Sequence, residues 1–216
     1  MGIKDRLNYY ASFSDQDVFQ PGKFNPGLFK MNKKKLKALR PGVYSIFNLL
    51  FGNTNDNPGC TESCLNDGDI QPAVVVSTSP LLVASYTDEM DAVIMLFFPE
   101  ELGLKRSWTV GKKLITVNSY NALGPVRKNN DIYPGPASSG KYRSIGPIVA
   151  ELYTDNQERV ARKVSEIPEE LYQHAFNLGK EYMAEHPGMA RNGLGFAYKN
   201  AQKIDTIKFS SSIKYD

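Results

Sequence analysis

Three apolar runs in the middle of the chain predict three neighbouring β-strands. Residues 73–78, 81–87 and 92–98 are rich in Val, Leu, Ile and Phe, and Ser79-Pro80 and the acidic turn 88–91 separate them. The third run is apolar at every position, whereas a strand with one solvent-facing side alternates with polar residues. We therefore expect a covering layer on each face of the sheet at this strand.

An alternation of apolar and polar residues over 108–117 predicts a hairpin near the edge of this sheet. Its two-residue turn is Gly111-Lys112, and glycine at the first turn position suits a type II′ turn. This register places Trp108 opposite Ile115. A weaker alternation over residues 203–215 predicts a further strand near the C-terminal end.

The last third of the chain has the apolar spacing of helices. A capping box, formed by Thr154 with Gln157 or by Asp155 with Glu158, predicts a short helix that runs to about residue 164. In a capping box, the first side chain accepts a hydrogen bond from the backbone N–H three residues on. Either pair therefore marks a helix start at residue 155 or 156.

A longer helix is predicted from Pro168 to about residue 185. Proline suits the first helical position, and Pro187-Gly188 ends the pattern. Gly179 in the middle suggests a close approach to another part of the backbone. The apolar face that we expect to cover the sheet carries Leu171, Ala175, Leu178 and Tyr182.

Consecutive strands followed by helices predict an α+β fold rather than a repeated βαβ fold. The expected sheet is mostly antiparallel or mixed, spans about residues 72–117 plus a C-terminal strand, and is covered by the C-terminal helices. The length of 216 residues fits one domain. Residues 1–42, which are basic and rich in aromatics, are expected to wrap the outside of this core.

Charge is unevenly distributed along a chain whose net charge is only +3. No acidic residue occurs between Asp17 and Asp56, and the segment 23–40 holds seven Lys and Arg residues. A short helix is predicted over 32–40, with Asn32 as its N-cap. Aromatic residues interleave with these charges, which is typical of surfaces that bind nucleic acids or acidic partners. The alternative is a basic helix face that only meets solvent.

Several function classes are excluded or disfavoured by composition. The longest apolar stretch, 92–99, is far shorter than the ~20 residues that a membrane-spanning helix needs. The first ten residues contain no apolar segment of the kind that a secretory signal carries. Two cysteines are too few to stabilise a fold of this length through disulfides, so we expect the protein to lie in a reducing compartment, the cytoplasm.

Two motifs resemble known chemistry only in part. Residues 135–141 have the glycine and lysine spacing of a phosphate-binding loop, but Tyr142 stands where such loops carry Ser or Thr, so a surface loop is expected. Cys60 and Cys64 lack two further ligands at zinc spacing, although either thiol could serve as a nucleophile beside a histidine. We therefore expect neither a metal nor a cofactor.

Two sets of polar residues are predicted to face solvent. Glu170, His174 and Glu181 share one face of the long helix, opposite its apolar face. The acidic residues of the turn 88–91 are expected to keep the end of a hairpin soluble.

Two long segments without apolar periodicity, 52–71 and 121–147, are predicted to be loops, and loops of such length are often functional. Our leading hypothesis is a non-enzymatic cytoplasmic protein that binds a macromolecular partner through these loops and the basic segment, for example as a bacterial partner-neutralising protein. One alternative is a small-molecule enzyme with its site where the loops meet, which would use Cys60 or Cys64 with a histidine, or Lys141 and Arg143 for an anionic substrate. The other alternative is a nucleic-acid binder that uses segment 23–40. The predicted contact residues are Lys33, Lys34, Lys35, Lys37, Arg40, Arg127, Lys128, Lys141 and Arg143.

Overall fold

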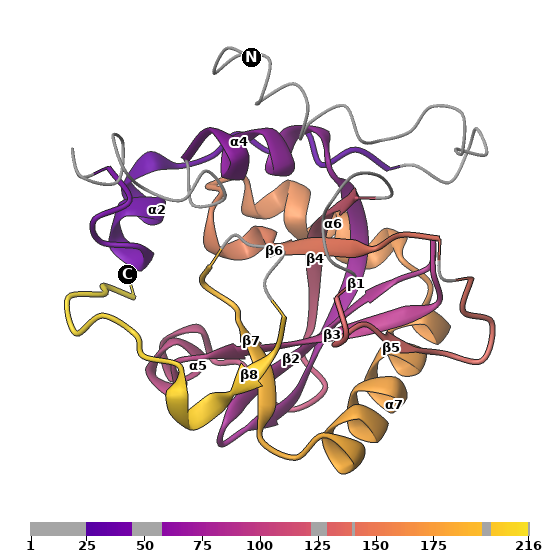
Figure 1. Ribbon diagram of the computed structural model, residues 1–216. Helices are drawn as coiled ribbons and strands as arrows, with labels where there is room; N and C mark the ends of the chain where they lie inside the picture. The colour runs from indigo at the N-terminus through magenta and orange to yellow at the C-terminus, as the bar shows by residue number, and fades with distance from the viewer. Residues whose placement is uncertain (1–24, 45–57, 122–128, 140, 196–199, 216) are drawn as a thin grey trace, which may run out of the picture.

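A mixed, curled β-sheet organises the chain. The structure is a computed structural model that describes residues 25–44, 58–121, 129–139, 141–195 and 200–215 (Figure 1). The strands are β1 (Asp69–Thr78), β2 (Leu81–Thr87), β3 (Ala92–Phe98), β4 (Lys113–Asn121), β5 (Tyr133–Pro134), β6 (Ser144–Val149), β7 (Met189–Asn192) and β8 (Gln202–Lys203). Their order is β6-β4-β1-β2-β3-β7-β8, and β5 also pairs with β3. All pairs are antiparallel except β3 with β7, which confirms the predicted α+β class.

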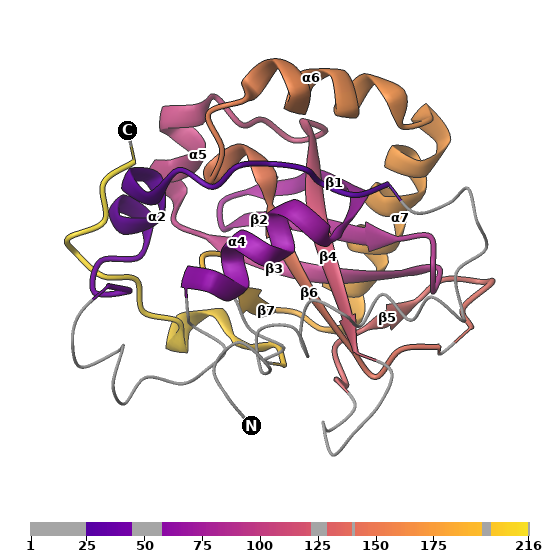
Figure 2. The same cartoon turned by 90° about the horizontal axis from the view of Figure 1, so that it is seen from above.

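Helices cover both faces of the sheet. They are α2 (Lys33–Leu39), α4 (Pro58–Asp67), α5 (Glu100–Arg106), α6 (Gln157–Glu166) and α7 (Glu169–Glu185), with 3₁₀ turns at Ala150–Leu152 and Ile204–Thr206. Helix α7 packs on β1, β2 and β3 from one side, whereas α4 and α6 contact β4 from the other (Figures 1 and 2). No helix among the described residues is long and apolar enough to cross a membrane.

The three central strands are those that the apolar runs predict. They pair in sequence order, and β3 is buried on both faces. Val93 and Met95 pack toward α7, while Ile94 and Leu96 belong to the larger apolar cluster on the opposite face. The expectation of a layer on each side of this strand is therefore confirmed.

Helix α7 lies very close to the sheet. Leu178 is 3% exposed, and a Cβ atom added to Gly179 would stand 2.7 Å from the Ala84 Cβ and 3.0 Å from Val76 Cγ1. Glycine is thus required here by space rather than by backbone conformation. The predicted long helix is confirmed, and Gly179 does lie close to the sheet, but the nearest atoms belong to side chains and not to another backbone.

The predicted hairpin over 108–117 is wrong. Strand β4 pairs with β1 on one side and β6 on the other, while residues 108–110 are not a strand. Trp108 follows α5 and packs its ring edge-to-face on Phe98, with the centroids 5.9 Å apart. The turn at Gly111 does bring the chain back, but it delivers β4 to the open edge of β1, where both faces of β4 are buried.

The predicted loop 52–71 is wrong in its described part, whereas residues 129–139 and 141–143 of the predicted loop 121–147 are irregular apart from the two-residue strand β5. Residues 58–67 form α4, whose Cys60, Cys64 and Leu65 are buried, and β1 begins at Asp69. In the second segment β6 starts at residue 144, and its Pro147 is tolerated because β6 is an edge strand. Residues 52–57 and 122–128 lie outside the described residues.

Two smaller predictions change in detail. The N-cap of α6 is Asn156, whose side chain accepts from Arg159 N at 3.0 Å, because Asp155 is already bonded to Asn32. The C-terminal alternation yields a strand only at Gln202–Lys203 within the described residues. The rest of 203–215 is a 3₁₀ turn and irregular chain.

The basic helix forms as predicted. Asn32 caps α2 by accepting from the backbone N–H groups of Lys34 and Lys35, and the buried residues are Leu36 and Leu39. Before this helix, Pro26 bridges to Asp69 of β1 and Met31 bridges to Thr154. Residues 25–31 therefore run across the β1 and α6 regions, while residues 1–24 lie outside the described part.

Candidate functional site

The predicted basic contact residues divide into structural and exposed groups. Lys35 is partly buried, with its Nζ 2.9 Å from Asp155 Oδ1 and 2.6 Å from the Thr154 carbonyl oxygen. Arg40 donates from Nη1 to Thr61 Oγ1 at 3.1 Å, which ties α2 to α4. Lys141 pairs with Glu89 at 2.7 Å. These three cations therefore make contacts within the protein.

The remaining predicted residues are exposed or outside the described chain. Lys33, Lys34 and Lys37 point from α2 into solvent, and no ion pair is found for them among the described residues. Arg143 is also exposed, on the segment just before β6. Arg127 and Lys128 lie outside the described residues.

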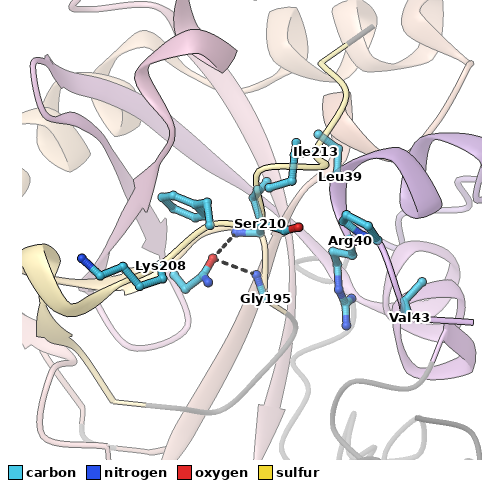
Figure 3. A pocket seen from close by; sticks show the side chains of 11 residues that line it. Leu39, Arg40, Val43, Gly195, Lys208, Ser210 and Ile213 are labelled. Atoms are coloured by element: carbon cyan, nitrogen blue, oxygen red, sulfur yellow. Dashed lines mark hydrogen bonds between the residues drawn. The ribbon is translucent and has the colours of Figure 1, made fainter. Parts of the chain in front are cut away.

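A pocket opens where α2 meets the C-terminal segment (Figure 3). Its cavity is about 230 Å³, and the segments join where Lys214 N donates to the Ala38 carbonyl oxygen at 3.0 Å. Leu39, Val43 and Ile213 contribute apolar side chains to its wall.

The charge of this pocket is positive. Arg40 and Lys208 line it, and Lys208 Nζ donates to the Asp205 carbonyl oxygen at 3.0 Å. No Asp or Glu among the described residues lines the pocket. Asn192 fixes one wall, because its Oδ1 accepts from the backbone N–H groups of Leu194 at 2.9 Å and Gly195 at 3.2 Å (Figure 3). A pocket with apolar walls and only cationic charge suits an apolar group that carries an anion.

A second cluster of polar groups is buried where β1, β2 and β4 meet. Gln71 Nε2 donates to Asp69 Oδ2 at 2.6 Å and to Asp88 Oδ1 at 2.7 Å. The Tyr120 hydroxyl donates to Asp69 Oδ2 at 3.0 Å and also bonds Thr87 Oγ1 at 2.8 Å. Together with the Asp88 backbone N–H, which donates to Gln71 Oε1 at 3.1 Å, these side chains join three strand ends.

Burial governs the ionisation of this cluster. Desolvation raises the pKa of Asp69 to about 7, against the lowering effect of hydrogen bonds from Gln71, the Asn25 backbone and Tyr120. Burial, with the nearby Asp69 charge, also raises the pKa of Tyr120 well above its usual value. The sequence analysis did not single out Asp69. An Asp and a Gln at the start of an apolar run could have indicated a buried polar cluster there.

The acidic turn 88–91 is not the exposed hairpin end that we expected. Asp91 is 8% exposed, with Oδ1 accepting from Tyr86 at 3.0 Å and lying 2.6 Å from His174 Nε2. Its Oδ2 accepts from Ala137 N at 2.7 Å. The prediction that His174 faces only solvent is therefore wrong: it joins α7 to the turn.

The segment 135–141, which resembles a phosphate-binding loop in sequence, contacts the acidic turn 88–91. Gly135 N donates to the Asp91 carbonyl oxygen at 2.6 Å, and Ser139 N donates to the Met90 carbonyl oxygen at 3.3 Å. Ala137 N donates to the Asp91 carboxylate, and Lys141 Nζ donates to the Glu89 carboxylate. These donors therefore all bind the protein's own acidic turn. This loop is thus bound to the turn, and its donors are not aimed at a ligand.

The buried ion pair between Arg191 and Asp131 was missed by sequence reasoning. Arg191 Nε and Nη2 bond the two Asp131 oxygens at 2.6 and 2.7 Å, and Nη1 donates to the Ile145 carbonyl oxygen at 2.6 Å. Arg191 is 3% exposed. The bidentate contact compensates the Asp131 charge and joins β7 to the segment before β5, while the bond to the Ile145 carbonyl oxygen joins β7 to β6.

The thiols and histidines do not form a catalytic or metal site. Cys60 and Cys64 are buried on α4, and burial raises the pKa of Cys64 to about 12, so this thiol stays protonated and weakly nucleophilic. His174 and His186 are on α7 and its C-cap. No group of three or more His, Cys, Asp and Glu residues suited to a metal occurs in the described part of the chain.

Comparison with known proteins finds no match to any family model, any curated protein or any solved structure.

Proposed function

We propose that the protein is a non-enzymatic cytoplasmic binding protein that recognises an acidic protein partner through α2 and the pocket beside it. The observation that carries this proposal is the pocket of about 230 Å³, which has Arg40 and Lys208 in its lining and no carboxylate side chain from the part of the chain that the structure describes. Protein interfaces concentrate their binding energy in a central pocket that receives one anchor side chain. The pocket suits an apolar anchor that is followed by a carboxylate.

The exposed lysines of α2 are placed to attract an acidic partner to the surface around this pocket. Lys33, Lys34 and Lys37 lie on the helix that leads to Leu39 and Arg40 of the pocket. Charges at the rim of an interface attract an oppositely charged partner and increase the association rate. This arrangement replaces the predicted role of the long loops, and a partner-neutralising function is compatible with it.

Other observations favour binding over catalysis in the cytoplasm. The buried Cys64 thiol and the internally paired Lys141 remove two groups on which the enzyme alternative relied. Two buried thiols on one helix, Cys60 and Cys64, fit a reducing compartment.

A comparison of charge-reversed variants tests the proposal. The triple variant Lys33→Glu, Lys34→Glu, Lys37→Glu and the pocket variant Lys208→Glu are used to capture partners from the native host. The control carries three reversals at the exposed Lys105, Lys180 and Lys203. We expect an acidic partner that wild type and control retain and that the other two variants bind at least about tenfold more weakly.

Equal capture by all variants would contradict the proposal. Binding of purified DNA or RNA at low salt, falling steeply as salt rises, would instead assign the lysines to phosphate contacts. Circular dichroism of every variant checks that the fold is retained.

A further inference from the structure

A second cavity lies at the C-terminal end of α7. It is about 360 Å³ in volume and is formed by residues 130–134, which include β5, together with the last turn of α7. Figure 1 shows β5 beside α7. This pocket shares no lining residue with the basic pocket of Figure 3, so an inference about it stands apart from the proposed function.

Three aromatic rings line this cavity at close range. Tyr182 and His186 stack with their centroids 4.8 Å apart, and Tyr133 stands edge-on to Tyr182 at 5.9 Å and to His186 at 6.0 Å. Tyr182 is buried, Tyr133 half-buried and His186 exposed, so the rings extend from the interior to the mouth. The faces of such rings carry negative potential, which attracts cations.

The charge in the lining is negative. Asp131 is neutralised by Arg191, whose Nε and Nη2 bond both carboxylate oxygens. Glu185 is the remaining carboxylate of the lining, and it is held in place because the Tyr133 hydroxyl donates to Glu185 Oε1 at 2.7 Å. No Lys or Arg among the described residues lines the cavity.

The phenol rings also remain neutral. The hydrogen bond to Glu185 raises the pKa of Tyr133 to about 12, and burial raises that of Tyr182 to about 12. Both rings therefore keep their hydroxyl hydrogens at neutral pH and the electrostatics of an intact phenol.

We propose that this aromatic pocket binds an organic ammonium group against the accessible rings of Tyr133 and His186, with Glu185 as its counter-charge. The buried Tyr182 ring stacks on His186 and supports it from the interior. Aromatic rings attract quaternary ammonium ions because their quadrupoles replace part of the lost hydration. The cavity of about 360 Å³ has room for a small alkylammonium ion such as choline.

Choline and its neutral shape analogue 3,3-dimethylbutan-1-ol distinguish this proposal from simple apolar binding. Chemical-shift titration of the ring signals of the full chain is the measurement. We expect choline to shift the Tyr133 and His186 signals and to bind at least about fivefold more tightly than the analogue. Equal binding of the two compounds, or no binding of choline, would overturn the proposal.

Two variants test the named groups. Glu185→Gln should weaken choline binding about threefold to tenfold, while Glu170→Gln, an exposed carboxylate at the start of the same helix, should leave it unchanged. Tyr133→Leu should weaken binding by a similar factor because a ring is lost. If Glu170→Gln weakens binding as much as Glu185→Gln, the attraction is due to overall charge and the pocket assignment is wrong.

Discussion

Asp69 and Asp91 are two buried aspartates that respond to burial in opposite ways. Asp69 is 1% exposed and Asp91 is 8% exposed. The pKa of Asp69 rises to about 7, whereas the pKa of Asp91 is lowered in spite of desolvation. The first therefore exchanges a proton near neutral pH, and the second is a fixed negative charge.

The difference arises from the donors around each carboxylate. Asp69 is bonded by the neutral Gln71 and Tyr120 side chains and by the Asn25 backbone N–H, with the charge of Asp88 nearby, and these contacts do not offset its desolvation. Asp91 receives the Ala137 backbone N–H and the imidazole of His174, both of which favour its charged form. Burial alone therefore does not decide the charge of a carboxyl group in this protein.

The largest expected effect comes from removing the fixed charge. Asp91→Ala leaves the Tyr86 hydroxyl, the Ala137 N–H and His174 without their acceptor, so we expect a loss of about 3 kcal/mol in the free energy of unfolding at pH 7. Because the Asp91 pKa is lowered in the folded state, its stabilisation is present at neutral pH and lost as the pH falls through that lowered value. Urea unfolding at pH 7 and pH 3 measures the loss of stability and its dependence on pH. A difference in unfolding free energy from wild type that is as large at pH 3 as at pH 7 contradicts this assignment.

The second prediction has the opposite sign. A raised pKa means that folding favours protonated Asp69, so its contribution is fully present below about pH 4 and is lost as the pH rises through about 7. Asp69→Asn should therefore stabilise the protein by about 2 kcal/mol at pH 8 and change little at pH 4. Thermal unfolding across this range decides it, and equal effects at both pH values would show that Asp69 is ionised throughout.

Glu151 offers an internal check on that pH profile. Burial raises its pKa to about 7 as well, and its Oε1 accepts from Ile115 N at 3.1 Å. Wild type should become more stable on acidification from pH 8 to pH 5. The double variant Asp69→Asn, Glu151→Gln should lose most of this slope.

A smaller effect is expected from the hydroxyl that joins the Asp69 cluster. Tyr120→Phe removes the hydrogen bonds to Asp69 and Thr87, at a cost of about 1 kcal/mol. It should also raise the Asp69 pKa further, since a donor to its charged form is lost. A carboxyl titration followed by NMR reads the pKa, and an unchanged value would mean that the hydroxyl does not favour the ionised carboxyl.

The smallest effect is expected at the histidine. His174→Gln keeps a donor near Asp91, and the His174 side chain is 34% exposed, so we expect a loss of about 0.5 kcal/mol. Chemical denaturation resolves such a change. A loss as large as that of Asp91→Ala would show that the imidazole, and not the backbone N–H, is the main partner of the carboxylate.

The parts of the fold that depend on a short apolar repeat were predictable. Strands 81–87 and 92–98, the helix with Leu178 on its inner face, and the Asn32 cap follow from residues close together in the sequence. The hairpin failed because pairing partners are chosen in three dimensions: β4 found the open edge of β1 instead of residues 108–110.

The polar sites were not predictable for the same reason. Tyr120 and Asp69 are 51 residues apart, and His174 is 83 residues from Asp91. A charged turn such as 88–91 is usually exposed, and nothing local to it shows that residues 135–139 and α7 will cover it. Of the proposed basic surface, the α2 lysines were predicted, but the role of Lys208 depends on where the C-terminal segment folds back.

The contact between Arg191 and Asp131 has a consequence for synthesis on the ribosome. Translation delivers Asp131 60 residues before Arg191, so a nascent chain that has already collapsed around β6 holds a carboxylate whose counter-ion has yet to be made. Such a charge resists burial. We therefore expect the region around β5 and β6 to stay hydrated until Arg191 has been synthesised and pairs with Asp131.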